Sequence, residues 1–185
     1  MSTDGVVAAS AGDAKSPWTG VRLATAGLAA FLSLLAAIRY GFKAETVVII
    51  GVIAVLVELS RHDLERHIIP NRIVLPAWLA VLFAHLALHP HHWLEWLGGS
   101  LGAGLFFLVV HLVYPAGLGM GDVKLTLLIG AALGWAVLAA LFLGTLAAGL
   151  VGAVLIFKEG SSARKRAIPL GPFLAAGTIV IILFF

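Results

Sequence analysis

Two aspartates in this sequence have the type and setting needed for acid–base chemistry. Asp122 follows the glycine-rich stretch 117–121 and precedes an apolar segment that begins at Leu125. Glycines carry no side chain, so another part of the backbone can approach this carboxylate closely. Asp63 lies in the polar stretch 61–67, which ends another apolar run. Two carboxylates near one another can share a proton, and one then acts as a base on water while the other acts as an acid. We therefore interpret Asp63 and Asp122 as a catalytic pair.

Each aspartate also has a plainer explanation. Asp63 has Arg61, Arg66 and Arg72 nearby in the sequence, which is typical of a solvated carboxylate among cations. Asp122 stands at the start of an apolar segment, where the first turn of a helix favours an acid through the helix dipole. Spacing alone leaves both explanations open.

The composition places these acids in a membrane protein. Of 185 residues, 61% are hydrophobic and 11% are charged, with a mean hydropathy of +1.08. A soluble domain carries about 25% charged residues. The absence of cysteine excludes disulfides and thiolate zinc sites, and we expect no metal or other cofactor. The basic residues that raise the pI to about 9.6 serve membrane topology rather than nucleic-acid binding. An integral membrane protein that binds no nucleic acid is the expected class.

Apolar segments predict an all-α, polytopic helix bundle with about seven transmembrane helices. Residues 123–157 would rise more than about 50 Å as one helix, whereas the hydrocarbon core is about 30 Å thick. This segment must therefore fold back, and Gly134-Trp135 is the expected bend. We expect one membrane domain, 18–185, after a disordered cytoplasmic tail, 1–17. The other predicted helices cover residues 23–38, 46–60, 73–88, 93–114 and 169–185.

Prolines set two of the expected helix ends. Pro70 cannot continue a helix and disfavours helical geometry at Ile69, so we expect the helix to end just after Asp63. Pro169 and Pro172 are expected in the first turn of the last helix.

The distribution of basic residues predicts the orientation. With the amino terminus in the cytoplasm, only Arg39 and Lys43 of the 12 basic residues fall on the outer side. Two predicted helices then separate Asp63 from Asp122, so both aspartates lie at the cytoplasmic face. The even count permits a two-carboxylate site without proving it.

Four sequence strings, in order, resemble motifs of the type IV prepilin peptidases, which are GxGD aspartic peptidases. In the first, DLERHIIPNRIVLP, Asp63 precedes Pro70 and Asn71 by seven and eight residues; the second is GMGDVKL, residues 119–125. The other two strings are residues 128–135 and 168–175. The resemblance covers roughly residues 46–177.

This resemblance implies an intramembrane-type aspartic endopeptidase. It would cut the leader peptide from type IV pilin-like precursors, which have a single transmembrane segment, at the cytoplasmic face of the inner membrane. Asp63 and Asp122 match the catalytic pair, and Gly119 and Gly121 match the glycines that shape the loop of the second aspartate. Supporting motif positions are matched by Pro70, Asn71 and Lys124. For Lys124, a lysine that reaches from the membrane to its surface is an equally good explanation.

One departure from the family pattern narrows the expected activity. Many members carry a cysteine-rich insert that is associated with N-methylation, and this sequence has no cysteine. It therefore resembles the short, peptidase-only form. The alternatives are a small ion- or proton-coupled transporter and a catalytically silent membrane partner in pilus assembly. Asp63 and Asp122 lie at span ends rather than at mid-membrane, which disfavours the transporter.

Other polar residues receive structural interpretations. Glu58 and His62 share a helix face at a spacing of four and are expected to pair, whereas Glu65 is expected to be solvated in a loop. A metal site is not expected at the histidines near 89–92; these, with His85, are interpreted as a polar turn at the membrane surface. Close helix packing is expected at Gly98, Gly102, Gly104, Gly144, Gly149 and Gly152.

Overall fold

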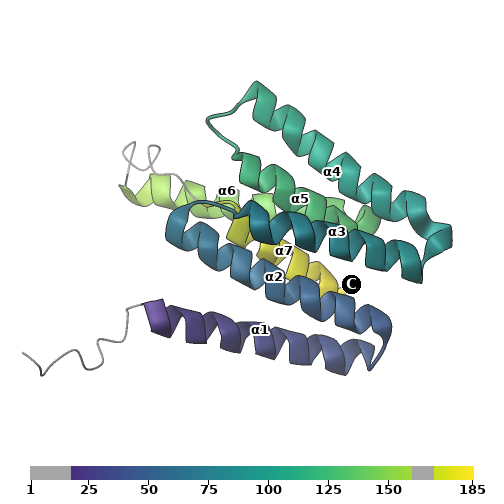
Figure 1. Ribbon diagram of the computed structural model, residues 1–185. Coiled ribbons are helices and arrows are strands. Elements are labelled where there is room, and N and C mark those ends of the chain that lie inside the picture. Colours follow the sequence, from purple (N-terminus) through teal and green to yellow (C-terminus); the bar gives the residue numbers. More distant parts are fainter. Residues whose placement is uncertain (1–17, 160–168) are drawn as a thin grey trace, which may run out of the picture.

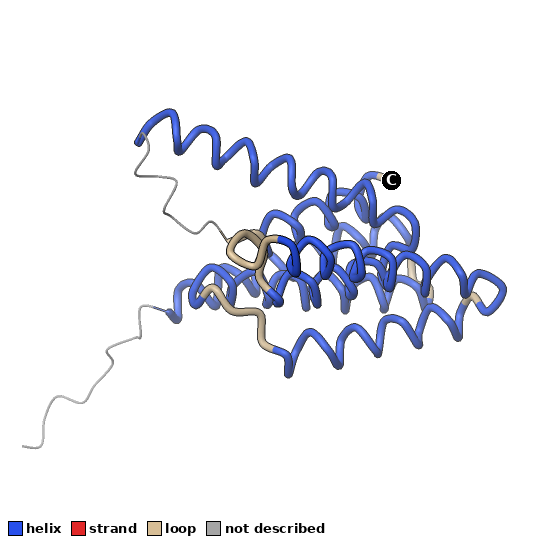
Figure 2. The backbone as a smooth tube through the Cα atoms, turned by 90° about the horizontal axis from the view of Figure 1, so that it is seen from above, coloured by secondary structure: helices blue, strands red, loops and turns tan. Residues whose placement is uncertain are grey.

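The computed structural model describes residues 18–159 and 169–185, and the described residues form a helix bundle without strands. The expected tail, 1–17, and part of the basic loop that follows α6 lie outside the described residues. The helices lie roughly lengthwise along one axis and spread apart at one end (Figure 2), with α1 and α4 at opposite edges of the view in Figure 1. The elements are α1 (Trp18–Tyr40), α2 (Ala44–Arg66), α3 (Asn71–Leu88), η1 (Pro90–His92), α4 (Trp93–Val113), α5 (Met120–Leu133), η2 (Gly134–Ala136), α6 (Val137–Glu159) and α7 (Gly171–Phe184).

The helix lengths confirm a polytopic all-α membrane protein. Among the described residues, four segments are long and apolar enough to cross a membrane: Gly20–Tyr40, Asn71–Leu88, Pro90–Val113 and Met120–Lys158. The last of these contains α5, η2 and α6. The two remaining helices are α2, which carries charged residues near both ends, and α7, which has 14 residues.

The bend after α5 lies where the sequence predicts it. Gly134 begins the 3₁₀ turn η2 with a φ of +57°, a left-handed conformation that glycine adopts without strain. The turn separates α5, with 14 residues, from α6, with 23. The prediction that this segment folds back at Gly134-Trp135 is confirmed.

Small residues bring α4 against α5 and α6 against α7. A Cβ on Gly130 would lie 2.3 Å from the carbonyl oxygen of Gly99, so the two backbones touch. Gly98, Gly104 and Gly144 also face neighbouring helices, as predicted. The packing prediction is wrong for Gly102 and Gly149, which have open space around them. On α4 the reason is that the buried face follows Gly99, Ser100, Ala103, Gly104 and Phe107, and Gly102 lies beside it.

Two predicted helix boundaries are wrong. The helix that carries Asp63 continues for almost one more turn to Arg66, and His67 ends it in the left-handed conformation, with φ 52° and ψ 36°. Pro70 restricts only Ile69 and removes an N–H that Arg66 would otherwise accept, so the helix has no reason to end sooner. At the other boundary, α7 begins at Gly171; Pro172 lies in its first turn, but Pro169 precedes it.

Candidate active site

Asp63 and Asp122 lie at one pocket. Asp63 is in the last turn of α2 and Asp122 is in the first turn of α5. Both side chains line a pocket of about 410 Å³ at the same end of the bundle. The chain segment between α2 and α3 and the start of α5 complete its wall, with His67, Ile68, Ile69, Pro70, Asn71, Gly119, Met120, Gly121 and Lys124. Every residue singled out as a candidate site residue from the sequence therefore lines this pocket.

Asp63 is buried rather than solvated. Its exposed fraction is 7%, and its Oδ2 accepts a hydrogen bond from the backbone N–H of Gly171 at 3.0 Å. Asp63 lies beyond the apolar run of α2, in a helix that is not among the four membrane-length segments. Burial raises the pKa of its carboxyl above the usual value, and the Gly171 hydrogen bond and the nearby His67 oppose that rise. The explanation of Asp63 as a solvated carboxylate among arginines is wrong.

Asp122 combines two roles that the sequence leaves as alternatives. It is the third residue of α5, and its Oδ2 accepts a hydrogen bond from the N–H of Gly119 at 3.3 Å. This contact is half of a capping box and satisfies one of the free N–H groups at the helix start. The same side chain lines the pocket together with Asp63. A first-turn acid can therefore also be a site residue.

Gly121 allows α5 to approach the segment between α2 and α3. A Cβ at this position would lie 3.0 Å from the Cβ of Ile69, which is closer than real Cβ atoms normally come. The space around Gly119 is less restricted, because its Cβ would lie 3.3 Å from Oδ2 of Asp122. Gly121 therefore lets the first turn of α5 pack against the pocket wall at Ile69.

Lys124, Asn71 and Pro70 connect α5 to α3 beside the pocket. The Nζ of Lys124 donates to Oδ1 of Asn71 at 2.7 Å. Pro70 precedes α3, and its carbonyl oxygen accepts from the N–H groups of Ile73 and Val74. Lys124 therefore binds a second motif residue instead of only extending toward the membrane surface.

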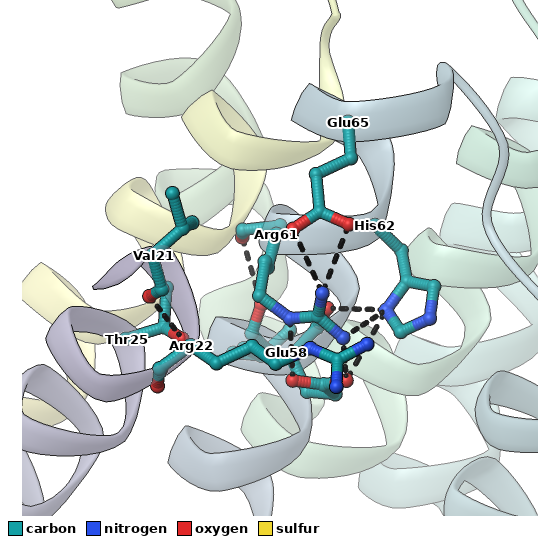
Figure 3. Close-up of polar contacts among 9 residues, drawn as sticks. Val21, Arg22, Thr25, Glu58, Arg61, His62 and Glu65 are labelled. Atoms are coloured by element: carbon teal, nitrogen blue, oxygen red, sulfur yellow. Dashed lines mark hydrogen bonds and ion pairs between the residues drawn. The ribbon is translucent and has the colours of Figure 1, made fainter. Parts of the chain in front are cut away.

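A separate polar network lies on another side of the same helix, α2 (Figure 3). Arg61 donates to Glu58 and, through Nη1, to Glu65 at 2.8 Å. The expected pair is confirmed, since Nδ1 of His62 lies 3.3 Å from Oε1 of Glu58. The prediction of a solvated Glu65 is wrong: its side chain is only 13% exposed. Because α2 continues to Arg66, Arg61 and Glu65 are one helical turn apart and can pair.

The histidines were interpreted as a polar turn at the membrane surface, and the structure differs from this interpretation at His85. His85 is buried rather than in a surface turn; its ring stacks on Trp96 at 4.1 Å, and its Nδ1 lies 2.8 Å from the carbonyl oxygen of Ala131. His89 lies 3.3 Å from Glu45. In the part of the chain that the structure describes, no three His, Cys, Asp or Glu side chains converge as metal ligands would.

Gly171 is the site residue that the sequence does not single out. It lies within a string that resembles the family, but nothing in its type announces a contact with an acid in a distant helix. Its N–H joins Asp63 across 108 residues of sequence. The only available signal was the pair of prolines around it, which predicts that a helix begins there with free N–H groups.

Comparisons with known proteins identify a family for this sequence. The sequence matches the type IV leader peptidase family over residues 49–157. It is 34% identical over 159 residues to the prepilin leader peptidase/N-methyltransferase of Bacillus subtilis, with 84% of this chain and 62% of that protein covered. The similarly named protein of Pseudomonas putida is 33% identical over 164 residues, with coverage of 83% and 55%. The chain thus spans little more than half the length of these relatives. No solved structure matches it.

Proposed function

The chain belongs to the type IV leader peptidase family, and we propose that it cleaves the leader peptide from type IV pilin-like precursors with Asp63 and Asp122 as the catalytic pair. One observation carries the assignment of these residues: the two carboxylates, from the end of α2 and the start of α5, line the same pocket. The name that these relatives share, prepilin leader peptidase/N-methyltransferase, supports leader cleavage as the reaction. The second activity in that name, N-methylation, is not part of this proposal.

The pair would act by general acid–base catalysis on a peptide carbonyl. The ionised carboxylate takes a proton from a water molecule, and the water oxygen bonds to the carbonyl carbon while the protonated carboxyl gives its proton to the carbonyl oxygen. The C–N bond then breaks as the leaving nitrogen receives the proton taken from water. The carbonyl forms again when the hydroxyl that received the second proton returns it. Both carboxyls are then ready for another cycle.

The membrane setting fits a substrate with one transmembrane segment. We propose that the amino terminus and the pocket face the cytoplasm, in the inner membrane, because this orientation places nearly all the basic residues on that side. The apolar segment of a precursor would remain in the bilayer while its leader reaches the pocket. The bilayer and the precursor are the partners in this proposal.

The test is leader cleavage of a co-expressed type IV pilin-like precursor, followed by immunoblotting. Asp63→Asn and Asp122→Asn should each lower the cleavage rate by about 10²–10⁴-fold, the usual contribution of an acid or base, at unchanged protein levels. Glu58→Gln is the matched control, because Glu58 lies on the same helix as Asp63 but outside the pocket. Cleavage that survives either aspartate substitution would remove that residue from the mechanism. A native chain that cleaves no precursor from several pilin classes would contradict the proposed function.

A further inference from the structure

The start of α7 makes a direct contact with one of the two pocket acids. The backbone N–H of Gly171, the first residue of α7, donates to Oδ2 of Asp63 at 3.0 Å, and the contact is buried. The first N–H groups of a helix have no acceptor within it, so they are free to bind an acid. The positive end of the helix dipole also favours a carboxylate there.

The contact depends on the absence of a side chain at position 171. A Cβ there would lie 2.7 Å from Oδ2 of Asp63 and 3.2 Å from its Cγ. Real Cβ atoms essentially never come within 3.0 Å of a non-bonded heavy atom elsewhere in the structure, so any other residue would displace the carboxylate or the start of α7. Glycine is therefore required here for close approach and not for a special backbone angle.

The two pocket acids are held to different degrees. Asp63 is bound by an N–H from a helix distant in the sequence, at 3.0 Å in a buried contact. Asp122 is bound by Gly119, three residues before it, at 3.3 Å in an exposed contact. Asp63 is thus fixed by tertiary structure, whereas the hold on Asp122 is local and longer.

We propose that Gly171 is a positioning residue for Asp63: its N–H fixes one carboxylate oxygen against α7 and so sets where the other oxygen faces the pocket. The consequence for cleavage rests on the proposed function, whereas the contact itself does not. An N–H donor can hold a carboxylate in place and still leave that carboxylate able to accept or release a proton. A displacement of about 1 Å at a reacting group can lower a rate by about 100-fold, so the position of Asp63 matters as much as its presence.

Gly171→Ala tests the effect on catalysis in the full chain, purified in detergent, with a pilin-like precursor as substrate. We expect kcat to fall by about 10–100-fold, because the new methyl group displaces the carboxylate. KM should stay within about twofold, since substrate contacts away from Asp63 are unchanged. Gly102→Ala and Gly149→Ala are matched controls, because a Cβ at either position meets nothing within 4 Å. Their kcat should equal that of the native chain.

A second measurement needs neither activity nor a substitution at position 171. Amide hydrogen exchange of Gly171, followed by NMR on ¹⁵N-glycine-labelled protein, should be about tenfold or more slower in the native chain than in Asp63→Ala, because the substitution removes the charged acceptor. Equal exchange rates in the two proteins would overturn the proposal. A Gly171→Ala variant with the same kcat as the control variants would also overturn it. So would a Gly171→Ala variant in which KM rises and thermal stability falls together with kcat. If the native chain cleaves no precursor, the proposed function fails and the exchange rates alone decide the contact.

Discussion

Four acids near the polar end of α2 are held by two different kinds of partner, an arginine side chain or a backbone N–H. On one side, Glu58 and Glu65 both pair with Arg61 (Figure 3). On the other side, at the pocket, Asp63 and Asp122 accept hydrogen bonds from backbone N–H groups. Within the described ranges, no ion pair involves either aspartate.

This difference separates acids that stabilise the structure from acids that are free to change their protonation state. An arginine keeps its charge at any pH a protein meets, so a carboxylate paired with it stays ionised. A backbone N–H fixes a carboxylate in place without adding a full positive charge beside it. Acids that are held only by N–H groups are therefore the better candidates for proton transfer.

Lys124 already lines the pocket, but it binds the neutral Asn71. Adding a second cation there would break the contrast and should have the largest effect. Met120 lines the pocket and is 42% exposed, so Met120→Lys brings an ammonium group near the aspartates without filling the core. An opposite charge nearby favours ionised carboxylates, which removes the protonated partner. We expect cleavage to fall by about 10–100-fold in a precursor-processing assay. Met120→Gln is the size-matched control. Equal activity of the two variants would contradict the argument.

Removing Arg61, the cation that pairs with Glu58 and Glu65, tests stability rather than catalysis. Arg61→Met leaves the largely buried Glu65 without its partner, and we expect a loss of about 1–3 kcal/mol in the free energy of unfolding, measured in detergent. Cleavage per folded molecule should stay within about twofold, since Arg61 does not line the pocket. The triple variant Glu58→Gln, Arg61→Met, Glu65→Gln removes all three charges and should recover most of the stability. A triple variant as unstable as Arg61→Met would show that the loss comes from packing rather than from unpaired charge.

The smallest effect is expected where a cation near the pocket binds a neutral group. Asn71→Ala removes the exposed hydrogen bond from Lys124 and should lower the free energy of unfolding by about 0.5–1.5 kcal/mol. A double-mutant cycle with Lys124→Met measures the interaction itself. If the two substitutions are additive, the contact contributes nothing to stability.

The sequence predicted the helices from general constraints, and it predicted the pairing of the two aspartates from the motif resemblance, which those constraints permit. The length of residues 123–157 forces a turn, and Gly134 provides it. An even number of helices between Asp63 and Asp122 allows both to reach one end of the bundle. These two arguments need only the chain length, hydropathy and the order of residues, whereas the motif resemblance singles out Asp63 and Asp122.

The contacts of individual side chains depend on details that the sequence leaves open. Glu65 was predicted to be solvated because the helix was expected to end before it, and the extra turn to Arg66 brings it to Arg61. The role of Gly171 depends on where the start of α7 lies relative to α2, which no local pattern determines. Gly102 was predicted to pack because spacing alone does not tell which face of α4 is buried.

The length of α5 bears on how deep in the bilayer the pocket lies. Its 14 residues rise only about 21 Å, roughly 9 Å less than the hydrocarbon thickness. If η2 lies near one surface of the bilayer, the first turn of α5 and Asp122 would lie below the opposite surface. Local thinning of the bilayer or a water-filled depression then makes up the difference. Under the proposed function, the water that Asp63 and Asp122 activate would reach them through such a depression.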